Sequence, residues 1–221
     1  MTNDITIELA GEALQLLPER AIYWPRRATL IVADLHWGKD ATFRAAGLAI
    51  PPGTTADDLA RLDCALERTG AARLLLLGDL LHARAGRDAA TFARVAEWRA
   101  RHAELAVTLV RGNHDRGAGD PPAKWGFAVA GEPLLVEPFV LCHHPQESPA
   151  GYVLAGHLHP AARLRGAGRQ QLQLPCFWFG PQAGVLPAFG GFTGGALVRP
   201  APGDRVFVLA GDAVLEAMLF T

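Results

Sequence analysis

The chain has 221 residues, of which 50% are hydrophobic and 19% are charged. This composition is typical of a globular protein with material for one sizeable core, so we expect a single domain over residues 1–221. Its 21 basic and 22 acidic residues give a formal net charge of −1, which excludes bulk positive charge as a means of binding nucleic acid.

The cysteines and the N-terminus predict a cytoplasmic protein. Cys64, Cys142 and Cys176 show no CxxC spacing, and their odd number fits reduced thiols better than a disulfide framework. The N-terminal "MTNDITIELAGEA" carries acidic residues and lacks the charged-then-apolar order of a signal peptide. The chain has no apolar run of about 18 residues, so we expect no membrane partner.

The first predicted elements are strands. Apolar residues alternate with polar ones over 5–9, and the Gly-Glu pair at 11–12 turns the chain, which predicts an opening β-hairpin. Residues 28–36 form an apolar run with a polar end, which indicates a buried strand.

Two predicted helices follow, with strands between them. The Thr-x-x-Asp pattern that begins at Thr54 predicts a helix start of the capping-box type, and Gly70 predicts its end. Residues 72–79 and 105–115 are further apolar runs with polar ends, and Asp88 predicts the start of a second helix between them. This β–α–β–α–β order predicts an α/β fold with a largely parallel sheet covered by helices.

The pattern changes after Gly131. Short apolar runs alternate with Gly and Pro and lack long helical periodicity, which predicts a strand-rich second half packed against the first. The glycine-rich stretch at 190–197 matches neither a dinucleotide-binding pattern nor a P-loop, so we expect an ordinary loop there.

Ligand-type residues follow five of the apolar runs. The strand-end residues are Asp34, His36, Asp79, Asn113, His114, Asp115, His143, His144, His157 and His159. Six of the chain's eight histidines lie among them, so the arrangement is not a random scatter. Because ligands bind at the carboxyl ends of strands in open α/β sheets, we expect these side chains to converge in one crevice.

The donor types indicate catalytic transition metals. Imidazole, carboxylate and amide donors, with Cys142 the sole cysteine at a strand end, argue against a closed structural zinc site. Such donors suit Mn, Fe, Co, Ni or Zn. Seven candidate ligands are too many for one ion and fit two ions that share a carboxylate. Two ions of this kind clamp the attacking and leaving oxygens in phosphoryl transfer, so we predict metal-assisted phosphoester hydrolysis.

The order D-x-H, G-D, G-N-H-D, H and G-H-x-H resembles the calcineurin-like metallophosphoesterase superfamily. Within it, "DLHWGK", "LLLLGDLLHA", "VRGNHDR", "CHHP" and "GHLHPA" are similar to the family of ligase-associated DNA damage response endonucleases (PdeM). The resemblance implies two packed mixed β-sheets flanked by helices, in a four-layer sandwich. It also implies a repair-associated phosphodiesterase or nuclease that uses two divalent ions, with Mn²⁺ favoured.

The resemblance also implies metal-ligand roles. The ligands implied for one ion are Asp34, His36, Asp79 and His159. Asp79 would bridge to a second ion, for which the other implied ligands are Asn113, His143 and His157.

The remaining strand-end residues receive other roles. The superfamily ligand is usually the first residue past the strand, which favours His143 over His144 as the ligand. His114 matches the proton donor to the leaving alkoxide, and the carboxylate of Asp115 beside it would orient the ring and keep it charged.

Lys39 and Arg111 could equally be solvated surface residues, and short arginine runs usually are, but basic residues beside the motifs are also candidate substrate contacts. They are Lys39, His82, Arg111, Arg163 and Arg165. The resemblance implies DNA as the substrate and a DNA ligase and a helicase as functional partners; the oligomeric state is left open.

Two other functions compete with a nuclease. The same centre could hydrolyse a small nucleotide or phosphomonoester, which the near-neutral charge favours slightly, although the sequence has no large insertion to form a lid over a small ligand. A scaffold that has lost its metal would be expected to have lost ligand positions, whereas all seven are present.

Overall fold

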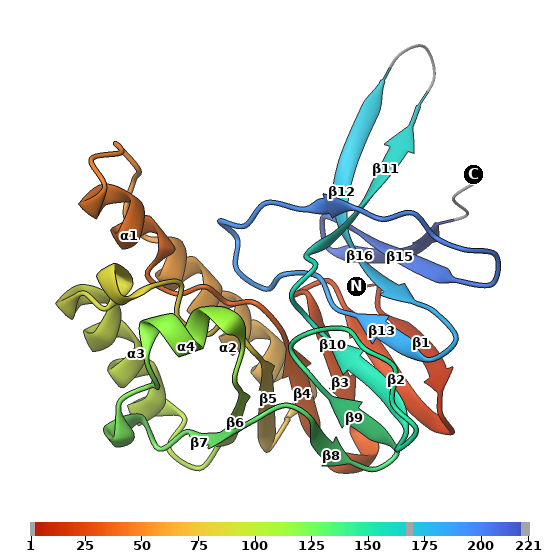
Figure 1. Ribbon diagram of the computed structural model, residues 1–221, viewed down its shortest axis with the longest axis horizontal. Coiled ribbons are helices and arrows are strands. Elements are labelled where there is room, and N and C mark those ends of the chain that lie inside the picture. The colour runs from red at the N-terminus through yellow and green to blue at the C-terminus, as the bar shows by residue number, and fades with distance from the viewer. Residues whose placement is uncertain (1–2, 167–169, 218–221) are drawn as a thin grey trace.

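Two β-sheets lie face to face, and helices cover the outer side of the first one (Figure 1). The structure is a computed structural model that describes residues 3–166 and 170–217. The prediction of an α/β fold with two packed mixed sheets is confirmed, and the described helices all lie on the side of the first sheet.

The first sheet has seven strands whose spatial order follows the chain. They are β1 (Ile5–Leu9), β2 (Glu12–Leu17), β3 (Ala21–Trp24), β4 (Thr29–Val32), β5 (Arg73–Leu77), β6 (Ala106–Val110) and β7 (Ala128–Ala130). Strands β1 to β4 pair antiparallel and β4 to β7 pair parallel. The predicted opening hairpin and parallel sheet are therefore present, and β4, β5 and β6 end at the same edge.

The second sheet is built from the chain beyond Gly131, where every regular element that the structure describes is a strand. Its path is β14 (Ala196–Leu197), β11 (Pro160–Arg165), β12 (Gln171–Phe179), β13 (Ala183–Val185), β10 (Tyr152–Ala155), β9 (Phe139–Leu141) and β8 (Leu134–Val136). Strand β15 (Arg205–Ala210) pairs with β12 and with β16 (Ala213–Ala217). Strands β9, β10 and β13 are parallel, so β9 and β10 also end at one edge.

Four α-helices lie between Lys39 and Ala118 in the described chain. They are α1 (Lys39–Ala45), α2 (Thr54–Thr69), α3 (Ala89–Arg101) and α4 (Asn113–Ala118). As predicted, α2 ends at a left-handed Gly70 and Asp88 caps α3 through the amides of Ala90 and Thr91. The predicted capping box at Thr54 is wrong, because the N-cap of α2 is Gly53 and no side chain caps it. No described helix is long and apolar enough to cross a membrane.

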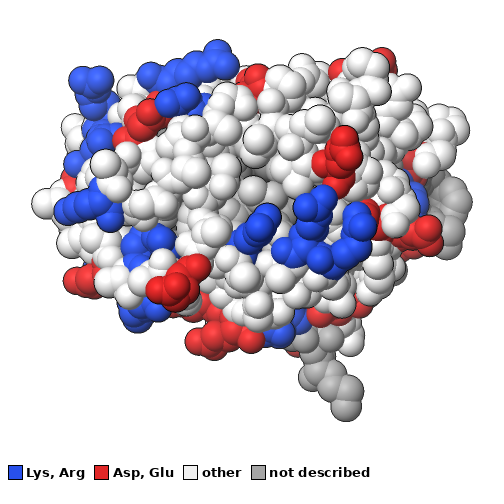
Figure 2. All heavy atoms as spheres, turned by 90° about the horizontal axis from the view of Figure 1, so that it is seen from below, with Lys and Arg blue, Asp and Glu red and all other residues white. Residues whose placement is uncertain are grey.

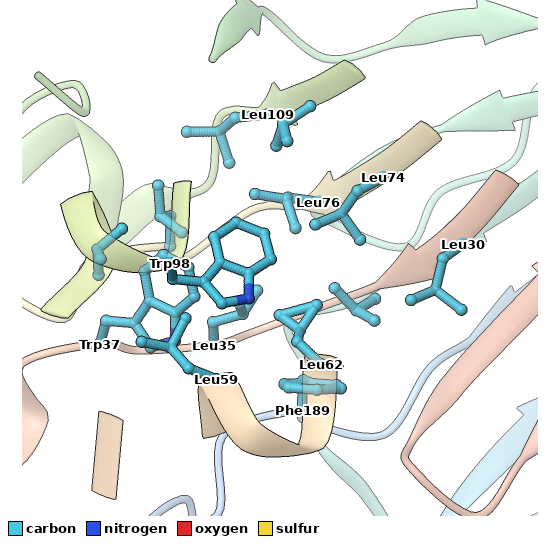
Figure 3. Close-up of a cluster of buried hydrophobic side chains, with 14 of the residues drawn as sticks. Leu30, Leu35, Trp37, Leu59, Leu62, Leu74, Leu76, Trp98, Leu109 and Phe189 are labelled. Atoms are coloured by element: carbon cyan, nitrogen blue, oxygen red, sulfur yellow. The ribbon is translucent and has the colours of Figure 1, made fainter. Parts of the chain in front are cut away.

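Two hydrophobic clusters hold the layers together. One packs α2 and α3 on the first sheet and includes Trp37, Leu62 and Trp98 (Figure 3). Phe189, which comes from the second half of the chain, is fully buried in the same cluster. The other cluster joins the two sheets and includes Leu75 of β5 and Phe207 of β15. Packing on Phe189 fixes the segment just before the glycine-rich stretch against the first sheet.

Candidate metal centre

The structure brings the seven predicted ligand residues together at the facing edges of the two sheets. The residues past strands of the first sheet are Asp34 and His36 after β4, Asp79 after β5 and Asn113 after β6. Those past strands of the second sheet are His143 after β9 and His157 and His159 after β10. The site thus depends on the packing of one sheet on the other.

Asp79 lies between two groups of donors. Its Oδ1 is 3.4 Å from His143 Nε2, and its Oδ2 is 3.7 Å from His36 Nε2. Each carboxylate oxygen therefore faces a different group, which is the placement expected of a carboxylate shared by two ions.

The two groups are compact. In the first, His159 Nε2 lies 3.3 Å from His36 Nε2 and 3.6 Å from Asp34 Oδ1. In the second, His143 Nε2 lies 2.8 Å from Asn113 Oδ1 and 3.1 Å from His157 Nδ1. Ligand atoms of Asp34, His36 and His159 all lie within 4.8 Å of one another.

Backbone carbonyls orient two of the imidazoles. Nδ1 of His143 donates to the carbonyl of Leu77 at 3.0 Å, and Nδ1 of His159 donates to the carbonyl of Gly194 at 3.2 Å. When either ring is neutral, its Nε2 therefore carries no proton. In both rings Nε2 is turned toward the other donors. Such partners fix the tautomer and the orientation of metal-binding histidines.

The donors fit divalent metal ions. Oδ1 of the fully buried Asp34 has no hydrogen-bond partner among the described residues, and imidazole nitrogens of His159 and His143 approach it only to 3.6 and 3.7 Å. A buried carboxylate oxygen without a hydrogen bond is costly unless a cation meets it. Burial lowers the pKa of His36 to about 2, and the nearby His159 and His114 act in the same direction. His36 is therefore neutral, as a metal ligand must be.

Five of the seven residues have a left-handed backbone. The φ angles are 56° at Asp34, 50° at His36, 52° at Asp79, 71° at His157 and 47° at His159. Such conformations cost of order 1–3 kcal/mol each outside glycine and cluster at functional sites. The surrounding sheets hold them, so the side chains are presented by a fixed backbone.

Two glycines explain why ligand residues follow glycine in the sequence. A Cβ at Gly112 would clash with the carboxylate of Asp79, and a Cβ at Gly156 would lie 2.6 Å from Asp34 Oδ2. The backbone before Asn113 and before His157 thus packs directly on the two central carboxylates.

The adjacent histidines His143 and His144 have different surroundings, although both belong to a group with His157 whose ligand atoms lie within 4.8 Å of one another. His143 is fully buried, whereas Nδ1 of His144 is 2.8 Å from Glu132 Oε1. The other oxygen of Glu132 accepts the backbone N–H groups of both histidines, at 2.9 and 3.0 Å. Sequence reasoning missed Glu132, which lies outside the strand-end pattern and holds the turn that presents His143.

We expect Glu132→Ala to weaken Mn²⁺ binding by about 10–100-fold, the usual cost of losing a group that orients a metal ligand. Equilibrium binding of Mn²⁺ to the full chain, followed by calorimetry, measures the change. Glu137→Ala is the matched control, because Glu137 is exposed and also precedes a proline. Equal affinities in both variants would exclude the positioning role.

The structure corrects the predicted role of Asp115. Its carboxylate does not contact the ring of His114; it accepts the backbone N–H groups of Leu80, Leu81 and Gly112. The ring of His114 is instead oriented by the carbonyl of His82, 2.6 Å from Nδ1. Asp115 ties the loop after β5 to the start of α4, because it is buried where both segments expose unpaired amides.

His114 lies beside the shared carboxylate. Its backbone N–H donates to Asp79 Oδ1 at 2.9 Å, and its Nε2 lies 3.9 Å from Asp79 Oδ2. Its side chain is 36% exposed, so the outer edge of the ring is open to a substrate.

The predicted substrate contacts have different surroundings. His82 joins the centre, because its ring stacks on His114 with centroids 4.9 Å apart and its Nδ1 is 3.3 Å from His36 Nδ1. Lys39 Nζ lies 5.9 Å from the ring centres of both Phe43 and Phe192.

The three arginines have other surroundings. Both ends of the Arg111 guanidinium fork are held by Asp120, at 2.7 and 2.6 Å, which leaves it poorly placed for phosphate. Arg163 and Arg165 are exposed on β11, in the hairpin that extends from the body of the molecule (Figure 1).

The comparisons with known proteins include a close structural likeness. No protein-family model and no curated protein matches the chain. The crystal structure of Pseudomonas putida nuclease MPE is 47% identical with a TM-score of 0.86, and the match covers 97% of this chain and 100% of that one. Yfce, a phosphoesterase from E. coli, is 18% identical with a TM-score of 0.39, over 83% and 88% of the two chains, and it carries no further weight.

Two packed mixed sheets with an Asp/His cluster across their strand ends define a metallophosphoesterase. The chain belongs to the metallophosphoesterase family that includes the Pseudomonas putida nuclease MPE. The predictions of this superfamily and of a phosphoric ester hydrolase are thereby confirmed.

Proposed function

We propose that this protein hydrolyses phosphodiester bonds in DNA at a centre that holds two divalent metal ions. The observation that carries the proposal is the placement of Asp79, whose two oxygens face two separate groups of donors. The likeness to a nuclease over the whole chain supports nucleic acid as the substrate.

The proposed ligands are those that meet in the two groups. Asp34, His36 and His159 would hold one ion, Asn113, His143 and His157 the other, and Asp79 both. Mn²⁺ is the proposed ion, and Fe, Zn, Co and Ni suit the same donors. When bound, such ions lower the pKa of water and neutralise charge on the phosphoryl oxygens.

The chain's own residues supply the proton and bind the substrate. With Nδ1–H held by the carbonyl of His82, the ring of His114 would offer Nε2–H to the leaving oxygen as a general acid. Lys39 and His82 border this position and are proposed to face the phosphate. Arg111, tied to Asp120, has the weakest case for such a role.

A cytoplasmic role in DNA repair, alongside a DNA ligase and a helicase, is part of the proposal and rests on the sequence resemblance. The formal net charge of −1 gives no argument for DNA as the substrate. On the face seen in Figure 2, lysines and arginines lie in small groups among uncharged and acidic side chains. Binding would therefore depend on local contacts near the centre.

The proposal is tested by turnover of metal-stripped protein reloaded with Mn²⁺. The substrates are bis-p-nitrophenyl phosphate, p-nitrophenyl phosphate, and single-stranded, nicked and supercoiled DNA. Metal-dependent cleavage of the diester and of DNA is expected. Turnover of small esters with DNA untouched would instead select the small-substrate alternative, and no turnover with any metal would contradict an enzyme.

The hairpin arginines give a further prediction for DNA. Replacing Arg163 and Arg165 with Gln together should reduce the slope of log kcat/KM for DNA against log salt by about 1.4–1.8, the change expected for two lost phosphate contacts. Arg73→Gln with Arg94→Gln removes the same charge from two exposed sites elsewhere and serves as the control. The same slope in both double variants would show that the hairpin does not contact DNA.

A further inference from the structure

A hollow next to the candidate metal centre is not used by the proposed mechanism. Its volume is about 160 Å³, and it shares His159 with the centre. The other lining residues come from the turn before β3, the β11–β12 hairpin and the glycine-rich segment, and include Arg20, Gln173, Leu174, Pro175 and Gly191.

The glycine-rich wall of this hollow is firmly held. Arg20 Nη1 donates to the carbonyls of Ala188 and Gly190, at 3.3 and 3.2 Å. Asp58, buried on α2, accepts the backbone N–H of Gly191 at 2.8 Å. With Phe189 buried in the core between these anchors, the wall is fixed before any ligand arrives.

The hollow combines a cation with an apolar wall. In the described chain, Arg20 bonds to backbone carbonyls and forms no ion pair with a carboxylate. A guanidinium has five N–H donors, so Arg20 keeps donors for an anion. Leu174 and Pro175 line the same space and are partly exposed, so they offer a surface on which a flat ring can pack.

The volume of the hollow indicates that it binds one part of a larger substrate. Pockets that enclose whole drug-sized ligands measure about 300–1,000 Å³, and this one has a volume of about 160 Å³. It therefore suits one unit of a polymer whose reacting phosphate lies at the neighbouring centre.

We propose that this hollow is a nucleotide subsite, and the inference rests on the proposed action on DNA. The nucleoside beside the cleaved bond packs on Leu174 and Pro175, and the phosphate on its far side faces Arg20. The subsite sets the register of the strand on the centre and favours nucleotide substrates over small diesters.

Binding of thymidine 3′,5′-bisphosphate to the full-length protein tests the subsite without catalysis. Gln173→Phe places a ring at the hollow, and Gln171→Phe is its matched control, because Gln171 is exposed two residues earlier on β12 and does not line the hollow. By calorimetry, we expect Gln173→Phe and Arg20→Gln each to raise Kd about tenfold, and Gln171→Phe to leave it within twofold. One Kd for all four proteins would overturn the subsite.

Hydrolysis of chromogenic esters provides a second readout. The substrates are bis-p-nitrophenyl phosphate and the p-nitrophenyl esters of thymidine 5′-phosphate and 3′-phosphate. For the wild type, kcat/KM for one of the nucleoside esters should be about tenfold higher than for bis-p-nitrophenyl phosphate. Gln173→Phe should remove this preference, and Gln171→Phe should keep it. A preference that survives in Gln173→Phe would overturn the subsite. If none of the esters is hydrolysed, the proposed function is contradicted. The calorimetric result would still show whether the hollow binds a nucleotide.

Discussion

Asp79→Asn should abolish hydrolysis of both bis-p-nitrophenyl phosphate and DNA, with kcat/KM reduced by about a thousandfold or more. A shared carboxylate that serves two ions contributes several kcal/mol of transition-state stabilisation, and each 1.4 kcal/mol is about tenfold in rate. The amide has the shape of the carboxylate but lacks its charge. Mn²⁺ bound per chain, measured by elemental analysis, should fall with activity.

The same substitution should not unfold the protein. Burial raises the pKa of the Asp79 carboxyl, and the neighbouring Asp34 acts in the same direction, so the negative charge is unfavourable in the metal-free fold. We expect the metal-free variant to keep or increase the Tm of the wild type. Asp57→Asn, at an exposed position in the first turn of α2, is the control, and an Asp79→Asn protein with full activity would contradict the shared-carboxylate assignment.

His114→Ala should affect substrates according to their leaving group. General acid catalysis contributes about 10²- to 10⁴-fold when the leaving oxygen needs a proton, as the alkoxide in DNA does. The p-nitrophenolate ion leaves without one, so the loss with bis-p-nitrophenyl phosphate should be less than about tenfold. Comparison of kcat for the two substrates measures the difference.

His102→Ala is the control for this variant, because His102 ends α3 and bonds to Asp63 rather than to the metal centre. Equal losses for DNA and for the nitrophenyl diester in His114→Ala would assign the ring to positioning of Asp79, whose Oδ2 lies 3.9 Å from Nε2 of the ring, and not to proton donation.

Much of the site could be predicted because strand ends carry a strong local signal. Apolar runs that end at Asp34, Asp79 and Asn113 indicate where parallel strands stop, and the structure places these residues at one edge. The C-terminal end of α2 could also be predicted from Gly70, since glycine adopts the left-handed conformation without strain.

Contacts set by tertiary packing could not be predicted in this way. Asp115 follows His114 in sequence, and this adjacency suggested a pair, but α4 turns the carboxylate toward the amides of the loop after β5. Glu132 and Arg20 lie far in sequence from the residues that they support, and neither belongs to a motif. Their roles depend on how the two sheets pack, which no local pattern encodes.

The left-handed conformations at the strand ends also limit which amino acids can occupy the site. Aspartate, asparagine and histidine adopt positive φ several times more often than other residues, while β-branched side chains there are outliers. The residues at these five positions are all aspartate or histidine. The backbone therefore limits sequence change at these positions: exchanges among aspartate, asparagine and histidine keep the strand ends as they are, whereas a β-branched residue would strain them.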